Sequence, residues 1–218
     1  MAEDDAADRG SPPCFAHLLV DGHRVDVETV RDVARFRRAE RSRLIAVRGL
    51  SAVARKEQTV ALIEALHDVV VPRPGLKIAV YWPIRGEPDL RGWMAQAHAA
   101  GAQILLPVVV EERAPLVFRS WSPDCRMERG FWNILVPADG ETVQPDTVIA
   151  PFVGVDENCF RLGNGGGYYD RTLAHIYPRP RLVGTGFSNC RMKTIFPMPW
   201  DIPMDVALLS DGSRLQRQ

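Results

Sequence analysis

The sequence predicts a single three-layer α/β domain built around a mostly parallel sheet. Short, nearly continuous apolar runs alternate along the chain with longer stretches whose apolar residues recur at helical spacing. Continuous apolar runs are typical of parallel strands that are covered on both faces. The length of 218 residues and the hydrophobic content of 46% suffice for one such core.

Two helices are expected before the first strand. Residues 1–28 show no sustained period and are interpreted as an extension that is ordered only in part, so the domain itself spans residues 29–218. The first helix covers 29–47, where apolar side chains alternate with many arginines. Ser51 is placed to cap the second helix, which ends at Pro72.

Strands and helices then alternate, as a parallel sheet with right-handed crossovers requires. A strand over 76–82 is followed by a helix over 87–100, which ends at Gly101, and by a strand over 103–110. The remaining elements are an added antiparallel strand over 115–121, a buried strand over 147–153, a helix over 168–176, and strands over 181–187 and 206–210. No internal repeat interrupts this order.

Composition argues against several classes of protein. Lys plus Arg equals Asp plus Glu at 27 each, so no net charge draws the chain to nucleic acid or to an anionic membrane. No apolar stretch reaches the roughly 18 residues of a membrane helix, and the first ten residues are acidic, so we expect a cytoplasmic protein. The four cysteines are too scattered for a zinc site and are expected to be free thiols.

The most informative segment is a glycine-rich loop between a buried strand and a helix, Arg161-Leu-Gly-Asn-Gly-Gly-Gly-Tyr-Tyr-Asp170-Arg171. In an open α/β sheet this is the carboxyl end of a strand, where ligands usually bind. Glycines let the backbone approach a ligand and turn N–H groups toward phosphate oxygens, and the following helix adds its dipole. Arg161 and Arg171 supply cationic donors, and Asp170 supplies a hard oxygen ligand suited to Mg²⁺.

Two familiar phosphate-binding motifs do not match this loop. The P-loop requires a lysine after its last glycine, and no lysine is near. The dinucleotide-binding fingerprint requires a third glycine where Tyr168 stands. A flexible surface turn without a ligand is the alternative, and the bracketing Arg161 and Asp170 argue against it.

The loop closely resembles the signature of the 5-formyltetrahydrofolate cyclo-ligase family, whose members are also called methenyltetrahydrofolate synthetases. The likeness covers about residues 35–211. Further segments follow in the family's order, namely 82–90, 106–116, 130–134 and a tail with Asp201, Pro203 and Asp205. The resemblance implies a Rossmann-like domain related to the ribose-5-phosphate isomerase and CoA-transferase type.

On the nucleotide side, the resemblance implies that the glycine loop binds ATP and that two arginines of the first helix add phosphate contacts. The residues assigned to ATP are Arg37, Arg41, Arg161, Leu162, Gly163, Asn164, Gly165, Gly166, Gly167, Tyr168 and Tyr169. Asp170 and Asp201 are assigned to Mg²⁺. From the residues alone, the helix arginines could equally form a solvated face, and Asp201 could be an ordinary turn acid.

On the folate side, the resemblance implies that Glu87 and Trp82 bind the reduced folate and that Trp132 stacks on one of its rings. Arg161 and Glu87 are the residues predicted to be catalytic. From the residues alone, Glu87 could be an acid in the first turn of a helix, favoured by the dipole, and Trp132 could be a core aromatic.

The sequence departs from the family pattern at several positions. Cys159 stands where glycine is common, Asn164 stands where an aromatic or similar residue is common, and the first helix carries arginine in place of the usual lysine. Cys190, Met198 and Trp200 replace Gln, Glu and His. These last three are expected to cluster near the nucleotide, and Met198 and Trp200 are expected to make the pocket beside Asp201 more apolar.

The activity implied by the resemblance is ATP-dependent cyclisation of 5-formyltetrahydrofolate to 5,10-methenyltetrahydrofolate, with release of ADP and phosphate and with Mg²⁺ as cofactor. Two other classes stay open: a paralogue that binds nucleotide or folate without cyclisation, and a sugar-phosphate isomerase that uses Glu87 as base. The expected partners are ATP and a reduced folate, with neither nucleic acid nor membrane, and the expected state is a monomer or weak homodimer.

Overall fold

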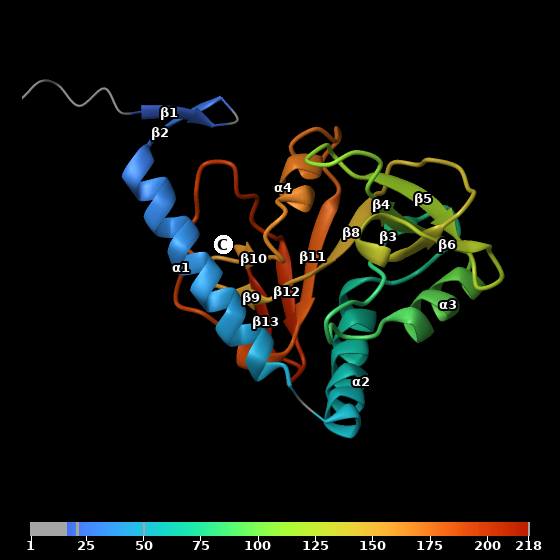
Figure 1. Ribbon diagram of the computed structural model, residues 1–218. Helices are drawn as coiled ribbons and strands as arrows, with labels where there is room; N and C mark the ends of the chain where they lie inside the picture. The colour runs from blue at the N-terminus through green and yellow to red at the C-terminus, as the bar shows by residue number, and fades with distance from the viewer. Residues whose placement is uncertain (1–16, 21, 50, 218) are drawn as a thin grey trace, which may run out of the picture.

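A computed structural model describes residues 17–20, 22–49 and 51–217, and a seven-stranded sheet forms its centre (Figure 1). The strand order is β13-β12-β11-β8-β3-β4-β5. The parallel strands are β3 (Lys77–Ala79), β4 (Gln103–Val108), β8 (Thr147–Pro151), β11 (Arg181–Gly186) and β12 (Val206–Leu209). The edge strands β5 (Val117–Trp121) and β13 (Arg214–Gln216) are antiparallel. The mostly parallel sheet with an antiparallel edge strand is therefore confirmed.

The described residues form four α-helices, α1 (Val27–Val47), α2 (Ala52–Val69), α3 (Arg91–Ala99) and α4 (Tyr168–Leu173). Ser51 caps α2 as expected, because its side chain accepts the N–H of Ala54 at 3.2 Å. The helix expected from residue 87 begins only at Arg91, so Glu87 lies in the preceding loop and receives no support from a helix dipole. Among the described residues, no helix combines the length and apolar character needed to cross a bilayer.

Short strand pairs complete the chain. They are the hairpins β1 (His17–Val20) with β2 (His23–Asp26), β6 (Met127–Arg129) with β7 (Leu135–Pro137), and β9 (Gly154–Val155) with β10 (Arg161–Leu162); the 3₁₀ turns are Phe131–Asn133 and Ser188–Cys190. The prediction for residues 1–16 lies outside the described part. The β9–β10 hairpin separates the glycine loop from β8, which the sequence reasoning did not foresee.

The two faces of the sheet are covered differently. On one face, α2 and α3 lie side by side and place Leu66 and Trp93 against Ile78 and Ile104 (Figure 1). On the other face, the short α4 and the loops around it cover the alternate strand residues, such as Leu105. The expected three layers thus comprise one helical layer, the sheet, and one layer built largely of loops.

Helix α1 packs at the side of the molecule rather than flat on the sheet. Its buried Leu44 contacts Val153, Leu162 and Ile195, so the helix lies across the β9–β10 hairpin (Figure 1). This packing brings the arginines of α1 beside the loop that follows β10.

The strand order places a crevice at the centre of the sheet. From β3 the chain continues to β4 on one side, whereas β8, β11 and β12 follow on the other. The connections that leave the carboxyl ends of β3 and β8 therefore diverge, and such a switch point is where open α/β sheets bind ligands.

Candidate active site

A large pocket opens at the switch point between β3 and β8. Its volume is about 1120 Å³, enough for more than one small molecule. Tyr81 and Trp82 line it from the end of β3, Pro107 lines it from β4, and Pro151 lines it from the end of β8. All the residues assigned to ligands from the sequence line this one pocket: Arg37, Arg41, Trp82, Glu87, Trp132, Arg161, Leu162, Gly163, Asn164, Gly165, Gly166, Gly167, Tyr168, Tyr169, Asp170 and Asp201.

The glycine loop, residues 163–167, has a backbone that only glycine adopts easily. Gly165 has φ +104° and Gly167 has φ +65°, and a Cβ on Gly166 would lie 2.6 Å from the ring of Tyr168. Helix α4, which follows, has only six residues, so its dipole contributes less than the sequence reasoning assumed. The N–H groups of the loop and the nearby arginines must therefore provide the attraction for an anion.

Two arginines stand beside the loop without a carboxylate partner among the described residues. Arg41 Nε donates to the carbonyl oxygen of Gly163 at 2.8 Å, and a Cβ on Gly165 would lie 3.4 Å from its Cζ. Arg171 stacks over the ring of Tyr168 at 5.6 Å, and its buried Nη1 has no hydrogen-bond partner. Burial, together with the charge of Arg37, lowers the pKa of Arg41. A bound phosphate group would satisfy both guanidinium groups.

Arg161 is the most buried of the cations in the pocket, with 7% of its surface exposed. Its Nη2 lies 2.9 Å from Asp170 Oδ2, and its guanidinium stacks over the ring of Tyr169 at 5.4 Å. The adjacent Leu162 packs into the core under α1 while also bordering the pocket. Arg161 is therefore fixed in place as a charge at the base of the loop.

Glu87 lines the pocket from the loop after β3, with only 4% of its surface exposed. Its Oε2 accepts the N–H of Ile84 at 3.0 Å, and its Oε1 accepts a hydrogen bond from Asn164 Nδ2 at 3.1 Å. Burial raises the pKa of Glu87, and these two hydrogen bonds oppose the rise. The side chain is thus a buried, oriented acceptor rather than a first-turn acid.

Aromatic side chains line part of the pocket. Trp132 is 58% exposed, which rules out a core position, and its ring meets that of Tyr168 edge-on at 5.3 Å. The backbone of Trp132 has φ +52°, a conformation that a tryptophan rarely adopts. Trp82 borders the same pocket with Arg91 stacked over its ring at 5.3 Å.

Arg37 does not point to the glycine loop as expected. Its Nη2 lies 2.5 Å from Asp201 Oδ2, and its Nε donates to the carbonyl oxygen of Ile195 at 2.9 Å. The guanidinium therefore fastens the segment 195–201 to α1. Of the two arginines predicted from this helix, Arg41 is the one that contacts the loop.

Asp170 and Asp201 lie on the same wall of the pocket, and hard carboxylate oxygens are a donor set that suits Mg²⁺. Each carboxylate is already paired, Asp170 with Arg161 and Asp201 with Arg37. Asp170 Oδ1 also accepts the N–H of Ile202 at 3.1 Å. Among the described residues, no group of three or more His, Cys, Asp or Glu side chains comes together as a metal site. A metal ion would have to share these oxygens with arginine.

Comparison with known proteins identifies the family. A family model described as "5-formyltetrahydrofolate cyclo-ligase family" matches residues 33–210. This chain belongs to that family. The resemblance drawn from the glycine loop is confirmed, and the matched region contains every predicted site residue.

Individual relatives of the 5-formyltetrahydrofolate cyclo-ligase family agree. The 5-formyltetrahydrofolate cyclo-ligase of Escherichia coli (strain K12) is 33% identical over 135 residues, 58% of this chain and 74% of the relative. The solved 5,10-methenyltetrahydrofolate synthetase of Aquifex aeolicus has a TM-score of 0.71 and 28% identity, covering 83% of this chain and 92% of its own. The Mycoplasma pneumoniae synthetase, at 21% identity and TM-score 0.64 over 79% and 97%, supports the fold alone.

The departures from the cyclo-ligase pattern can now be placed. Cys159 has φ +63° and is fully buried, which explains why glycine is natural there. Cys190 and Met198 are buried and do not line the pocket, whereas Trp200 does. Of the three changes expected near the nucleotide, only Trp200 therefore borders the pocket.

Four pocket residues with titratable side chains were not predicted from the sequence. Tyr81 and Arg85 belong to the same loop as Trp82 and Glu87, so they could have been predicted from their closeness in the sequence to these two residues. His23, on the N-terminal hairpin, and His175, after α4, carried no such signal. In total, five arginines (37, 41, 85, 161 and 171) and three acids (87, 170 and 201) line the pocket, which therefore favours anions.

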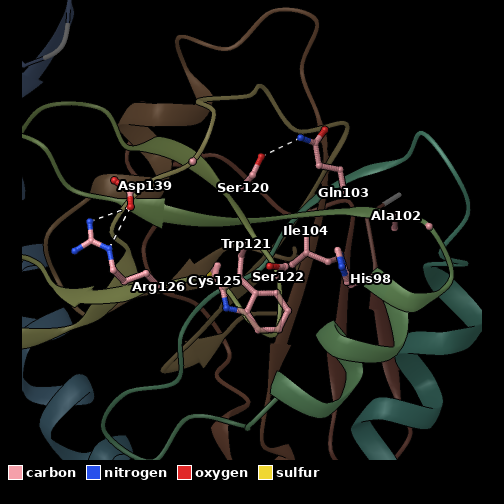
Figure 2. A pocket seen from close by; sticks show the side chains of 12 residues that line it. His98, Ala102, Gln103, Ile104, Ser120, Trp121, Ser122, Cys125, Arg126 and Asp139 are labelled. Carbon is pink, nitrogen blue, oxygen red and sulfur yellow. Dashed lines mark hydrogen bonds and ion pairs between the residues drawn. The ribbon is translucent and has the colours of Figure 1, made fainter.

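A second hollow of about 530 Å³ lies beside β4 and β5 and shares no residue with the main pocket (Figure 2). Four of its polar side chains are already paired, Gln103 with Ser120 at 2.9 Å and Arg126 with Asp139 at 2.9 Å. None of its residues was predicted as a site residue, and we assign it no role in the reaction.

Proposed function

We propose that the protein catalyses the ATP-dependent cyclisation of 5-formyltetrahydrofolate to 5,10-methenyltetrahydrofolate. One observation carries the proposal: a phosphate cradle and a buried carboxylate, which suit different ligands, meet in one cavity. Asn164 of the cradle touches Glu87 at 3.1 Å. Two substrates held on these two sides would have their reacting groups in the space between them.

The nucleotide side of the pocket suits the triphosphate of ATP. The N–H groups of residues 163–167 would donate to phosphate oxygens, Arg41 and Arg171 would supply charge beside the loop, and Arg161 would supply it at the base. Arg41 and Arg171 have no carboxylate partner among the described residues, so no carboxylate in that part of the chain competes with a phosphate for them. We assign Arg161 to the charge that develops on the transferred phosphoryl group.

The folate side suits a pterin ring and its flat benzoyl extension. Glu87 offers acceptor oxygens to ring N–H groups, and Trp82 and Trp132 offer aromatic surface. Glu87 is buried, so a hydrogen bond to the pterin would be shielded from water and correspondingly strong. The pocket is large enough to hold both substrates together.

The reaction needs alignment and charge neutralisation more than covalent help. The formyl oxygen attacks the γ-phosphorus, the bond to the ADP oxygen breaks, and ADP leaves. N10 then adds to the activated formyl carbon and loses its proton. The C–O bond breaks, phosphate departs, and the methenyl bridge remains. No protein nucleophile takes part, and the buried Cys159 and Cys190 are packing residues.

Mg²⁺ is proposed as the partner of ATP, with Asp170 and Asp201 as the side chains that would hold it. When bound, it would neutralise phosphate charge. Arg161 and Arg37 now occupy these carboxylates, so we expect the metal and the arginines to compete for the same oxygens. The phosphates of ATP offer Arg161 an alternative acceptor.

Three further properties are proposed. The first is a location in the cytoplasm, which is reducing and therefore suits the free thiols of the described cysteines, Cys125, Cys159 and Cys190. A monomer or weak homodimer remains our proposal for the oligomeric state. The parallel strand order supports a Rossmann-like domain of the ribose-5-phosphate isomerase and CoA-transferase type.

Thermal-shift measurements with separate ligands test the proposal. Mg-ATP and 5-formyltetrahydrofolate should each raise the melting temperature, since a ligand at 100 times its Kd adds about 2.7 kcal/mol of stability. Sugar phosphates at the same concentration should not. Stabilisation by a sugar phosphate alone would contradict the proposal and favour an isomerase.

A further inference from the structure

Asn164 and Glu87 form a contact across the switch point of the sheet. They lie 77 residues apart in the chain, and Asn164 Nδ2 is 3.1 Å from Glu87 Oε1. Glu87 follows β3, and Asn164 belongs to the glycine loop reached from β8. An ionised carboxylate can only accept hydrogen bonds, so the amide nitrogen must be the atom of Asn164 that faces it.

The position of Asn164 is set by the glycine loop. Its neighbour Gly165 has φ +104°, and Arg41 Nε holds the carbonyl oxygen of its other neighbour, Gly163, at 2.8 Å. The direction of the Asn164 side chain therefore depends on the same backbone that forms the phosphate cradle. This residue is also one of the chain's departures from the family pattern, so the contact is a feature of this chain.

Glu87 depends on few partners for its orientation. Its other oxygen accepts the N–H of Ile84 at 3.0 Å, which lies within its own loop. Asn164 is the partner that comes from a distant segment of the chain, the glycine loop. Without the Asn164 amide, the Glu87 carboxylate could rotate, and its Oε1 could take up a proton.

Two arginines and two tyrosines are the charged and titratable groups that interact with Glu87 among the described residues. Arg48, at the end of α1, and Arg85, in the same loop, lower the pKa of Glu87 through their charge. Tyr81 and Tyr169 stay protonated because burial raises the pKa of each phenol. Burial of Glu87 is the largest influence and raises its pKa, while the hydrogen bonds from Ile84 and Asn164 work against that rise.

We infer that Asn164 is a positioning residue for the folate half of the site: its amide orients the Glu87 carboxylate and favours its ionised form. The inference rests on the proposed function, in which Glu87 accepts hydrogen bonds from the folate. Asn164 lies in the nucleotide loop, yet its main effect is on the other substrate. Replacement of its amide should therefore disturb folate binding more than ATP binding.

The test compares three variants of the full chain. Asn164→Leu has nearly the same shape but no donor, and Asn164→Gln keeps the amide on a longer side chain. Asn189→Leu is the matched control, since Asn189 is exposed outside the pocket and makes only two long contacts: its Nδ2 donates to the carbonyl of Val47 at 3.4 Å and its Oδ1 accepts from Cys190 Sγ at 3.5 Å. For each, KM for both substrates, kcat, and the pH profile of folate binding by calorimetry without ATP are measured.

The expected pattern is specific. Asn164→Leu should raise KM for the folate roughly tenfold, the effect of one hydrogen bond to a charged group, with KM for ATP changed by less than about twofold. The acid limb of folate binding should move to higher pH, because Glu87 loses a bond that favours its charged form. Asn164→Gln should recover part of both effects, and the control should match the wild type.

Failure of this inference can be told apart from failure of the proposed function. If wild-type protein forms product but Asn164→Leu leaves the acid limb in place, or raises both KM values equally, the inference is overturned. If wild-type protein binds folate without forming product, and the limb moves in Asn164→Leu, the inference stands and the proposed reaction fails. Absence of folate binding by wild-type protein would overturn both.

Discussion

Arg37 and Asp201 clamp the segment 195–201 to helix α1 by a two-pronged ion pair. Arg37 Nη2 lies 2.5 Å from Asp201 Oδ2, and Arg37 Nη1 lies 3.1 Å from Oδ1. The side chains are only 13% and 10% exposed. Further bonds from Nε to the carbonyl of Ile195 and from Nη2 to that of Phe196 employ every nitrogen of the guanidinium.

Alanine substitutions at Arg37 and Arg41 should separate stability from nucleotide binding. Arg37→Ala leaves Asp201 buried without its cation and should lower the free energy of unfolding by about 3 kcal/mol, measured by urea denaturation. Arg41→Ala, one turn further along α1, breaks one bond to Gly163 and should change stability by less than about 1 kcal/mol. It should instead raise KM for ATP about tenfold. A large loss of stability in Arg41→Ala, with stability unchanged in Arg37→Ala, would contradict the role of Arg37 as a clamp.

Asp170→Asn should remove Mg²⁺-dependent turnover while the fold persists. The amide keeps the shape that accepts the N–H of Ile202, but it loses the charge that attracts a divalent cation and holds Arg161. The measurement is rate against Mg²⁺ concentration. Asp205→Asn is the control: Asp205 accepts the N–H of Leu182 at 2.7 Å outside the pocket, and its replacement should not alter the Mg²⁺ response. A wild-type Mg²⁺ response in Asp170→Asn would rule out the metal role.

Glu87 should make stability depend on pH. Because the pKa of Glu87 is raised in the folded state, the unfolded chain loses this proton first as pH rises above the ordinary value of 4.5. The contribution of Glu87 to stability should therefore fall with rising pH until the raised folded-state pKa is passed. Glu87→Gln should lack this dependence, seen as a wild-type melting temperature that falls relative to the variant over that range. Parallel curves for the two proteins would show that Glu87 titrates normally.

Cys159 should tolerate glycine better than valine. Its backbone is left-handed, with φ +63°, and its side chain is fully buried. Cys159→Gly relieves about 1 kcal/mol of backbone strain and loses a similar amount of packing, so stability should change little. Cys159→Val puts a branched side chain into a conformation that it rarely adopts and should cost at least about 2 kcal/mol. Urea denaturation of both variants checks this order.

Features of the site that depend on residues close together in the chain could be predicted from the sequence. The glycines at 163, 165, 166 and 167 indicate a backbone that approaches a ligand. The strand directly before them, β10, belongs to the separate β9–β10 hairpin and not to the central sheet, which the apolar pattern did not reveal. The apolar runs likewise predicted the parallel strands. The start of α3 was misplaced because Pro88 and Asp89 extend the loop, which Tyr81 holds through its bond to the carbonyl of Pro88 at 2.9 Å.

Contacts between distant residues could not be predicted. Arg37 was assigned to ATP, yet its partner Asp201 lies 164 residues away, and only the packing of α1 over β9 and β10 brings them together. The bond between Asn164 and Glu87 requires the strand order, which periodicity alone does not give. The ion pairs of the two carboxylates assigned to Mg²⁺ were not predicted, because their arginine partners could not be identified from spacing.

The central claim is that ATP and the folate react in the pocket between β3 and β8. The most direct measurement is the growth of near-ultraviolet absorbance from methenyltetrahydrofolate, with 5-formyltetrahydrofolate and Mg²⁺, in the presence and absence of ATP. We predict product only with ATP, and a rate reduced at least about tenfold in Arg161→Ala, which removes the buried charge at the base of the loop. Measurable binding of both ligands without ATP-dependent product would contradict the account and leave a protein that binds these ligands without cyclising the folate.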